Sequence, residues 1–283
     1  MVDEALLFSE YKFLLVVQSS WMTVMWLICI NFKNGSMVDF GWPSGFFFMA
    51  VYYLITGEGW IYRRMLICIP LILCGLRFMV GWFRRKHHYK EDARWEMWRE
   101  RWRKGEGWFS IKNVSVNFLV FYYAQSLYNV FFVSFPIIMM TNNKTEQFNY
   151  CNEGVGLCIW LLSFIIENTA DITLTRFKVK NKGKKLVCKE GLWYYSRHPN
   201  YFAELLLWIA YFIMCLNSVN NTYEYAVLSV LPTGAYYFLV HFTGVWMAEL
   251  GSVKNRGQEY IDYQATTNMI FPWFPKSLPS KSN

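Results

Sequence analysis

Residues 65–82 read MLICIPLILCGLRFMVGW, and the residues that follow, 83–90, read FRRKHHYK. A helix that crosses a bilayer needs about 20 mostly apolar residues, and the first stretch is of that kind, with Arg77 as its charged residue. Lys and Arg directly after a span are typical of its cytosolic end. The same alternation of long apolar runs and short basic or acidic loops extends along the rest of the chain.

The composition agrees with a membrane bundle. Of 283 residues, 54% are hydrophobic and 17% are charged, against about 25% charged in a soluble domain. Seven spans would take about 140 residues, so one bundle fills the chain as a single integral membrane domain, 1–283. The net charge of +8 comes from Lys and Arg in a few loops, which indicates membrane topology and not a nucleic-acid partner.

We predict an all-α polytopic transmembrane helix bundle of about seven spans. The expected spans are about 11–30, 38–55, 65–82, 116–140, 155–166 continuing towards 171, 201–216 and 225–248. Pro232 and Gly234 are expected to kink the last of them, which membrane helices tolerate when neighbours satisfy the freed carbonyls.

Loop charge supports this number of spans. Segments 83–113 and 172–199 and the tail after Leu250 are basic, whereas the amino terminus and the loops 141–153 and 217–224 are acidic. Seven spans place all basic segments on one face, which the positive-inside rule makes cytosolic, or matrix in a mitochondrial membrane. Arg63 and Arg64 fall on the opposite face and conflict with the rule.

Between the third and fourth spans, Trp95, Trp98 and Trp102 recur at helical spacing. We interpret this stretch as an interfacial amphipathic helix whose rings anchor it at the membrane surface. The seven cysteines include no C-x-x-C pair and the four histidines no H-E-x-x-H arrangement, so we predict no metal site.

Polar groups inside apolar runs are the candidate functional residues, because they are costly in a bilayer. Glu167 and Asp171 are four apart, so their carboxylates share a helix face and could order a ribose or nicotinamide or form salt bridges. Arg197 and His198 precede Pro199, a favourable first helix residue, and so lie where an anion such as pyrophosphate could bind. Asn200 and Glu204 share one face of that helix.

A further polar set lies in the fourth span. It consists of Tyr122, Gln125, Ser126 and Asn129. Hydrogen bonds between helices are the simplest interpretation, and the lining of a substrate cavity is the alternative.

Several ordered motifs together resemble the DUF1295 branch of the steroid 5-alpha-reductase-like membrane proteins. The main one is Gly191 to Glu204, GLWYYSRHPNYFAE. The others are the segments 36–42 and 91–95, Gln125, the pair Glu167 and Asp171, the pair Tyr260 and Tyr263, and the ending 271–275. The steroid-reductase-like region covers residues 34–276, with a cofactor-binding half at 155–276.

The resemblance implies an NADPH-dependent reductase of an activated carbon–carbon double bond, such as an enone, in a steroid or other lipid. It implies that the endoplasmic reticulum membrane is the location, with the mitochondrial inner membrane as the alternative. The cofactor-binding candidates are Glu167, Asp171, Arg197, His198, Asn200, Tyr201, Glu204 and Tyr260. Asp39 and Tyr122 are candidate catalytic residues by polarity and span position only.

The chain also departs from the family pattern. Ala203 stands where the family usually has Gly, and Glu167 where the 5-alpha reductases proper have Asn. Two other functions stay open. One is methyl transfer from S-adenosylmethionine, because isoprenylcysteine and phospholipid methyltransferases share R-H-P-x-Y, although Glu249-Leu250 stands where they usually have two acids. The other is a catalytically silent subunit with a partner in a larger membrane complex.

Overall fold

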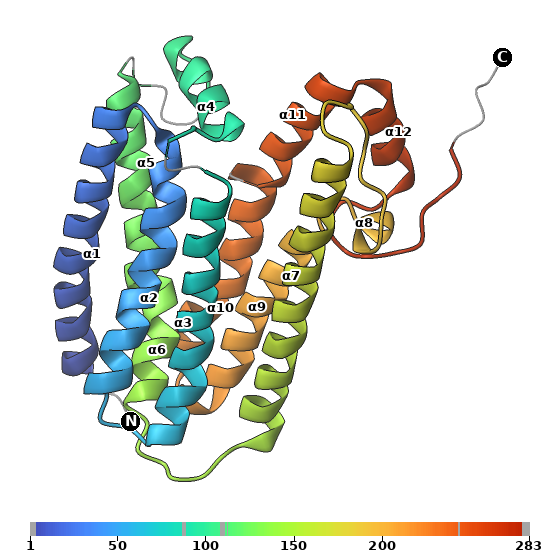
Figure 1. Ribbon diagram of the computed structural model, residues 1–283. Helices are drawn as coiled ribbons and strands as arrows, with labels where there is room; N and C mark the ends of the chain where they lie inside the picture. Colours follow the sequence, from blue (N-terminus) through green and yellow to red (C-terminus); the bar gives the residue numbers. More distant parts are fainter. Residues whose placement is uncertain (1–3, 87–88, 108–110, 112, 243, 279–283) are drawn as a thin grey trace. The chain divides into compact units, whose positions relative to one another are not determined.

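A computed structural model describes residues 4–86, 89–107, 111, 113–242 and 244–278. These residues form helices joined by short loops, and no strand occurs among them. The chain divides into two compact units (Figure 1). Unit 1 comprises Met1–Val155 and Tyr211–Leu231, and unit 2 comprises Gly156–Ala210 and Pro232–Asn283.

Unit 1 is built mainly from the helices of the amino-terminal half. In chain order they are α1 (Glu4–Phe32), η1 (Gly35–Met37), α2 (Val38–Thr56), α3 (Ile61–Arg84), α4 (Ala93–Arg103), α5 (Val114–Tyr128), η2 (Asn129–Val133), α6 (Ser134–Thr141) and η3 (Tyr150–Gly154). The turn η4 (Leu216–Ser218) also belongs to it. The predicted fourth span is therefore a helix with one π-helical turn, η2, in its middle.

Unit 2 contains the helices of the carboxy-terminal half. They are α7 (Val155–Lys180), α8 (Leu192–Tyr195), α9 (Pro199–Cys215), α10 (Thr222–Tyr237), η5 (Phe238–Phe242), α11 (Val245–Arg256) and α12 (Gln258–Thr266). Helices α9 and α10 cross the boundary, so each contributes one end to unit 1. Pro199 is the first residue of α9, as predicted, because its missing N–H costs nothing there.

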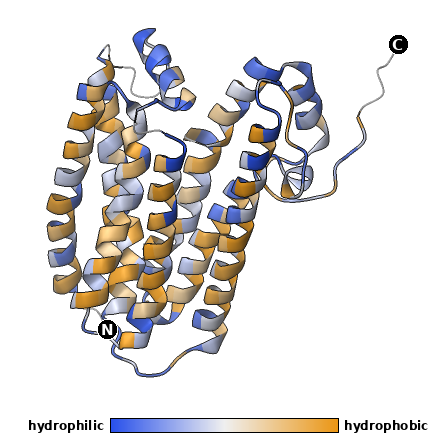
Figure 2. Cartoon of the chain, viewed as in Figure 1, coloured by the Kyte–Doolittle hydropathy of each residue, from blue (hydrophilic) through white to orange (hydrophobic). Residues whose placement is uncertain are grey.

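Six helical stretches are long and apolar enough to cross a membrane. They are Glu4–Phe32, Ile61–Arg84, Val114–Thr141, Tyr150–Lys180, Pro199–Ser218 and Thr222–Arg256. Figure 2 shows their hydrophobic middles and more hydrophilic ends. The all-α polytopic bundle is thus confirmed, and the chain is an integral membrane protein. The predicted second span forms a helix, α2, that does not belong to this set.

The last predicted span contains a break that the sequence analysis did not predict, in addition to the kink expected at Pro232 and Gly234, which stays a prediction. Pro232 lies inside α10, which continues to Tyr237. The interruption comes later, at the π-helical turn η5 and at Gly244, where α11 begins. A Cβ at Gly244 would lie 2.3 Å from the backbone oxygen of Leu239. The close approach of these two backbone segments, and not the proline, therefore marks the break.

The helix predicted between the third and fourth spans exists as α4, but its tryptophans do not face the membrane surface. Trp95, Trp98 and Trp102 are buried. The ring centroid of Trp95 lies 5.1 Å from that of Phe121, and that of Trp102 lies 4.9 Å from that of Phe118, both edge-to-face. Since Phe118 and Phe121 of α5 offer such contacts, α4 packs on α5 through the face that was expected to meet lipid.

Arg63 and Arg64, which conflict with the positive-inside rule, are both committed to contacts within unit 1. Arg63 is buried, forms an ion pair with Glu153, and donates to the Thr145 and Gln147 carbonyls at 2.6 Å each. Arg64 donates to the carbonyl oxygens of Gly57 and Leu54, at 2.6 and 3.1 Å. Arg63 therefore holds the loop before α7, and Arg64 caps the carboxyl end of α2.

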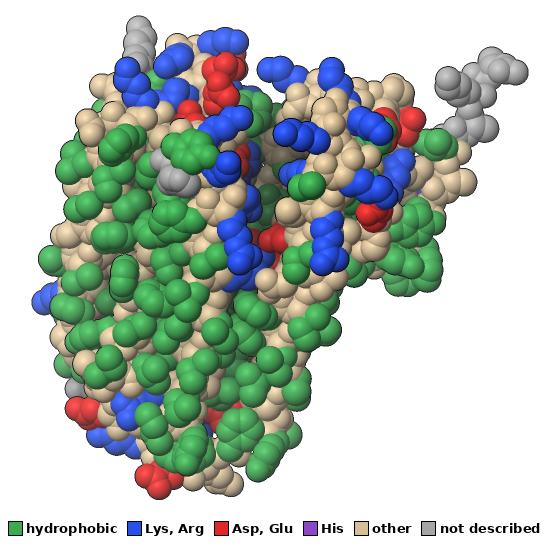
Figure 3. Space-filling view, in the orientation of Figure 1, with side chains coloured by type: hydrophobic (Ala, Val, Ile, Leu, Met, Phe, Trp, Pro, Cys, Tyr) green, Lys and Arg blue, Asp and Glu red, His purple; other side chains and the backbone are tan. Residues whose placement is uncertain are grey.

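Lys and Arg side chains gather at one end of unit 2, around the carboxyl ends of α7 and α11, with hydrophobic side chains next to them (Figure 3). The predicted basic segment 172–199 supplies many of these charges. The basic end of α7 and the start of α9 bring the candidate cofactor residues to this end of the unit.

Candidate functional site

Helices α7 and α9 pack against each other at two polar contacts. The Asn200 Nδ2 donates to Asp171 Oδ1 at 3.4 Å, and Ser163 Oγ donates to the Ala203 carbonyl at 2.5 Å. Glu167 is buried and lies between Ser163 and Asp171 on α7. The structure therefore brings Asp171 together with Asn200, and Glu167 lies about one turn earlier on α7.

Asn200 has one polar atom that the protein does not satisfy. Its Oδ1 is buried and accepts no hydrogen bond, while its Nδ2 is held by Asp171. A buried amide oxygen without a donor is costly, by about 1–3 kcal/mol. This oxygen is therefore suited to accept a hydrogen bond from a ligand that carries an N–H or O–H group.

Two further candidates on α9 flank this contact. Glu204 follows Asn200 by four residues and so lies on the same helix face. Ala203, the residue that replaces the usual Gly, is fully buried. Its carbonyl oxygen accepts from Ser163 Oγ of α7.

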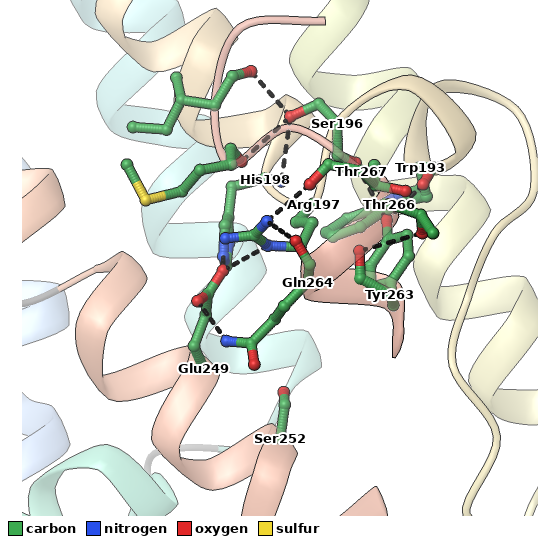
Figure 4. A network of polar contacts seen from close by, with 12 residues as sticks. Trp193, Ser196, Arg197, His198, Glu249, Ser252, Tyr263, Gln264, Thr266 and Thr267 are labelled. Atoms are coloured by element: carbon green, nitrogen blue, oxygen red, sulfur yellow. Dashed lines mark hydrogen bonds and ion pairs between the residues drawn. The ribbon is translucent and has the colours of Figure 1, made fainter. Parts of the chain in front are cut away.

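Arg197 and His198 face Glu249 of α11 and not an open anion site (Figure 4). Glu249 Oε1 accepts from Arg197 Nε at 2.7 Å and lies 3.0 Å from His198 Nε2. Gln264 Nε2 of α12 donates to Glu249 Oε2 at 2.7 Å. The sequence analysis placed Arg197 and His198 but missed the roles of Glu249 and Gln264, because no spacing signal connects residues so far apart along the chain.

Backbone contacts hold the turn before α9 in the same network. Arg197 N donates to the Asn268 carbonyl at 2.9 Å, and the Arg197 guanidinium donates to the Thr267 carbonyl at 2.6 Å. Ser196 Oγ donates to the Ile270 carbonyl at 2.7 Å, and Tyr263 donates to the carbonyls of Trp193 and Ser196. The chain after α12 therefore fixes the position of Pro199 and Asn200.

Burial changes the titration of two candidates outside the spans. It lowers the pKa of His198, and the neighbouring carboxylate of Glu249 opposes this change only in part. Burial also raises the pKa of Tyr260 to about 12. At neutral pH His198 is therefore neutral and Tyr260 keeps its proton. Tyr201 stacks on His198, with 5.3 Å between ring centroids.

A basic cavity of about 210 Å³ lies at the carboxyl end of α7. Its lining combines Lys178, Lys182, Lys184 and Arg256 with apolar Leu174 and Phe177. Arg256 Nε donates to the Leu186 carbonyl at 3.0 Å, which ties α11 to the loop after α7. Several cations around one cavity suit a phosphate group.

The candidate catalytic residues Asp39 and Tyr122 lie in unit 1. Asp39 Oδ2 accepts from Arg94 Nη2 at 3.1 Å and from Trp95 Nε1 at 2.9 Å. Tyr122 is fully buried and donates to the Gly35 carbonyl at 3.3 Å. Both side chains bind the segment 35–39 to its neighbours, and their role as proton donors stays a prediction.

The polar set of the fourth span includes one hydrogen bond between helices. Asn129 Nδ2 donates to the Trp42 carbonyl of α2 at 3.1 Å. Gln18 of α1, which the sequence analysis did not select, donates to the Gly45 carbonyl of α2 at 3.0 Å. In the described part of the chain, no group of three His, Cys, Asp or Glu side chains could hold a metal ion.

Comparison with known proteins gives a family and no activity. The sequence pattern of the family described as "Protein of unknown function (DUF1295)" matches residues 25–267. No curated protein and no solved structure matches the chain. The matched region contains both polar contacts between α7 and α9 and the contacts of Glu249 with Arg197, His198 and Gln264, whereas Asn268 and Ile270 lie just beyond it. Since it covers most of the sequence, the chain belongs to the DUF1295 family.

Proposed function

We propose that this protein is a membrane-embedded reductase that uses NADPH to reduce an activated carbon–carbon double bond in a steroid or other lipid. The buried Asn200 Oδ1, which accepts no hydrogen bond within the protein, is the observation on which the proposal rests. The carboxamide of a nicotinamide carries N–H donors that such an oxygen would accept. Asp171 orients the Asn200 amide for this contact by accepting from its Nδ2.

The basic cavity supports binding of a dinucleotide in the same unit. Lys178 follows Asp171 by seven residues on α7, which corresponds to about 10 Å along the helix axis. Asn200 would hold the nicotinamide end, and Lys178, Lys182 and Arg256 would attract and hold phosphate groups. The cavity thus provides positive charge for the phosphate groups at the carboxyl end of α7, the helix that also carries Glu167 and Asp171.

The bound cofactor would supply hydride. Addition of hydride to the β carbon of an enone leaves negative charge on the carbonyl oxygen, and a side chain must stabilise this charge and provide a proton. Asp39 and Tyr122 stay the candidates for this role. A lipid substrate fits a chain whose long helices lie in a bilayer, and the family resemblance supports the endoplasmic reticulum as its location.

The test is dinucleotide binding by the purified protein in detergent. We expect NADPH to raise the midpoint of thermal unfolding of the native protein. Asn200→Ala should lose most of this rise, because the buried amide acceptor is removed. Asn255→Ala, which removes an exposed amide on α11, is the matched control and should keep the rise in the unfolding midpoint with NADPH.

Other outcomes would replace the proposal. Stabilisation by S-adenosylmethionine and none by NADPH would indicate methyl transfer. No stabilisation by either compound, together with co-purification in fixed stoichiometry with a larger assembly, would indicate a structural subunit. If NADPH binds, consumption of NADPH with a set of enone lipids then identifies the substrate class.

A further inference from the structure

The chain after α12 presents a row of aromatic side chains to the outside. Phe271, Trp273 and Phe274 are 57%, 68% and 70% exposed, and Tyr194 and Tyr195 of α8 are 48% and 37% exposed. Residues 265–275 carry no charge. A contiguous exposed apolar surface of this kind marks a contact with another protein or with a membrane.

These rings are held in place and do not belong to a loose tail. Trp273 N donates to the Tyr195 carbonyl at 3.0 Å, and Lys276 N donates to the Thr266 carbonyl at 2.8 Å. The rings of Tyr195 and Phe274 meet edge-to-face, with 5.7 Å between centroids. Residues 271–275 and α8 therefore form one surface, which we call the aromatic clasp and which comprises Tyr194, Tyr195, Phe271, Trp273 and Phe274.

The position of the aromatic clasp along the chain places it near the membrane surface. Tyr195 precedes Pro199 by four residues, and Pro199 is the first residue of a span. Four residues extend at most about 14 Å, so Tyr195 lies close to the end of that span. Because Trp273 is bonded to Tyr195, the segment 271–275 lies at a similar level.

The chemistry of the aromatic clasp fits the headgroup layer better than a protein partner. Trp and Tyr are enriched at the boundary between lipid and water, because each ring has an apolar body and a polar edge. Lys276, directly after the aromatic clasp, is exposed, and the end of the unit nearby is rich in Lys and Arg (Figure 3). Such charges attract the anionic lipids of a cytoplasmic leaflet.

We infer that the aromatic clasp inserts into the headgroup layer of the leaflet on the basic side of the membrane, with anionic phospholipid as its partner. The membrane then supports the turn that carries Arg197 and His198, since the chain between α12 and the clasp bonds to that turn through Asn268 and Ile270. The inference does not rest on the reductase proposal, because it concerns lipid contact alone.

Site-specific photocrosslinking tests whether the aromatic clasp contacts phospholipid. The photoreactive residue benzoylphenylalanine replaces Phe274 in the full chain, which is reconstituted into vesicles of phosphatidylcholine and phosphatidylserine without dinucleotide. After illumination, mass spectrometry identifies what is attached at position 274. Benzoylphenylalanine in place of Leu161, which is exposed on the apolar helix α7, is the positive control. Benzoylphenylalanine in place of Gln258, which is exposed and polar on α12, is the negative control.

We expect phospholipid adducts at positions 274 and 161 and none at 258. Adducts at 161 but not at 274 would overturn the inference. So would attachment of position 274 to a second copy of the chain or to another protein, because the surface would then be a protein interface.

A pair of variants provides a second measurement. The native protein should gain thermal stability when phosphatidylserine is added to the detergent. The double substitution Trp273→Ser and Phe274→Ser should lose most of this gain, whereas Trp273→Tyr, which keeps an interfacial ring, should retain it. If all variants fold, an equal gain in thermal stability in the native protein, the double variant and Trp273→Tyr would contradict the inference.

Discussion

Asn200 and Glu249 show what single residues do at the start of α9. Asn200 bonds to Asp171 through one amide atom and leaves the other buried without a donor, which suits a ligand. In Glu249, by contrast, both carboxylate oxygens have partners, because it accepts from Arg197 and Gln264 and lies within bonding distance of His198. One side chain is therefore suited to binding, and the other to positioning.

Sequence spacing places candidate residues on shared helix faces, but it predicts neither of these roles; a binding role for Asn200 is what the family resemblance implies. Residues four apart on one helix share a face, so the pair Glu167 and Asp171 and the pair Asn200 and Glu204 follow from the helix period alone. The contact of Arg197 with Glu249 joins residues 52 positions apart. It depends on how α9, α11 and α12 pack, and no local pattern contains that information.

We predict that Glu249→Gln destabilises unit 2. The Arg197 side chain is only 10% exposed, and removing the charge of its partner leaves a largely buried guanidinium without a counter-ion. Breaking such a pair costs on the order of 3 kcal/mol. Thermal unfolding in detergent should show a clear fall in the midpoint. Glu190→Gln, at an exposed carboxylate, should leave the midpoint within error, and an equal fall in both variants would refute the assignment.

His198 should make stability depend on pH. Its pKa lies below the ordinary value because burial disfavours the imidazolium. As the pH falls through about 6.5, the unfolded chain takes up a proton that the folded chain resists, so the free energy of unfolding decreases. Unfolding midpoints measured between neutral and mildly acidic pH should therefore decline less in His198→Gln than in the native protein. The other histidines are present in both proteins, so parallel curves would mean that His198 does not contribute.

At the scale of helices, the sequence predicted the positions of most helices but not the break between α10 and α11. Hydropathy locates a helix because a span must be mostly apolar, and α1, α3, α7 and α9 appear where apolar runs predicted them. The break between α10 and α11 was not predicted, because the sequence offers only Pro232 and Gly234 as signals, and Pro232 can stay in a membrane helix when its neighbours compensate. The actual break depends on the approach of Gly244 to Leu239, which is a contact and not a propensity.

For helix α4, too, the sequence predicts the helix but not the contacts of its aromatic face. The spacing of Trp95, Trp98 and Trp102 correctly predicts a helix with one aromatic face. It does not say what this face contacts, because lipid headgroups and the rings of α5 are both suitable surroundings for tryptophan. The bonds of Asp39 to Arg94 and Trp95 decide the outcome, since they hold α4 against the start of α2.

We predict that the packing of α2 on α3 tolerates no side chain at Gly75. A Cβ at this position would lie 2.8 Å from the Phe47 Cβ and 3.2 Å from the Pro43 carbonyl oxygen. Overpacking of this kind costs about 1–3 kcal/mol, so Gly75→Ala should lower the unfolding midpoint. Gly251→Ala is the matched control, because nothing lies within 4 Å of its added Cβ. An unchanged midpoint in Gly75→Ala would show that the two helices can separate without cost.

At the scale of the whole molecule, the distribution of charge defines an orientation that can be measured. Helix α7 has 26 residues, which corresponds to about 39 Å and exceeds the hydrocarbon thickness of about 30 Å. The exposed Cys151 precedes it, and the Lys-rich segment follows it. The two ends of α7 should therefore lie on opposite sides of the membrane, with the basic end in the cytosol or matrix.

Labelling in sealed vesicles tests this orientation. In a Cys158→Ser background, a thiol reagent that cannot cross the membrane should reach Cys151 from one side only. In a Cys151→Ser and Cys158→Ser background, a cysteine introduced by Lys184→Cys should react from the other side only. Reaction of both positions from the same side would mean that α7 does not cross the bilayer.

The ion pair of Arg63 with Glu153 has a consequence for biosynthesis. The two residues are 90 positions apart, so a ribosome needs roughly 5 to 20 seconds to deliver the acid after the arginine. During that interval the guanidinium stands near the bilayer without its counter-charge, which holds the entrance of α3 at the aqueous boundary. The final packing of the entrance of α3 must therefore wait until Glu153, directly before α7, has emerged, and a chain arrested before residue 153 should lack this ion pair.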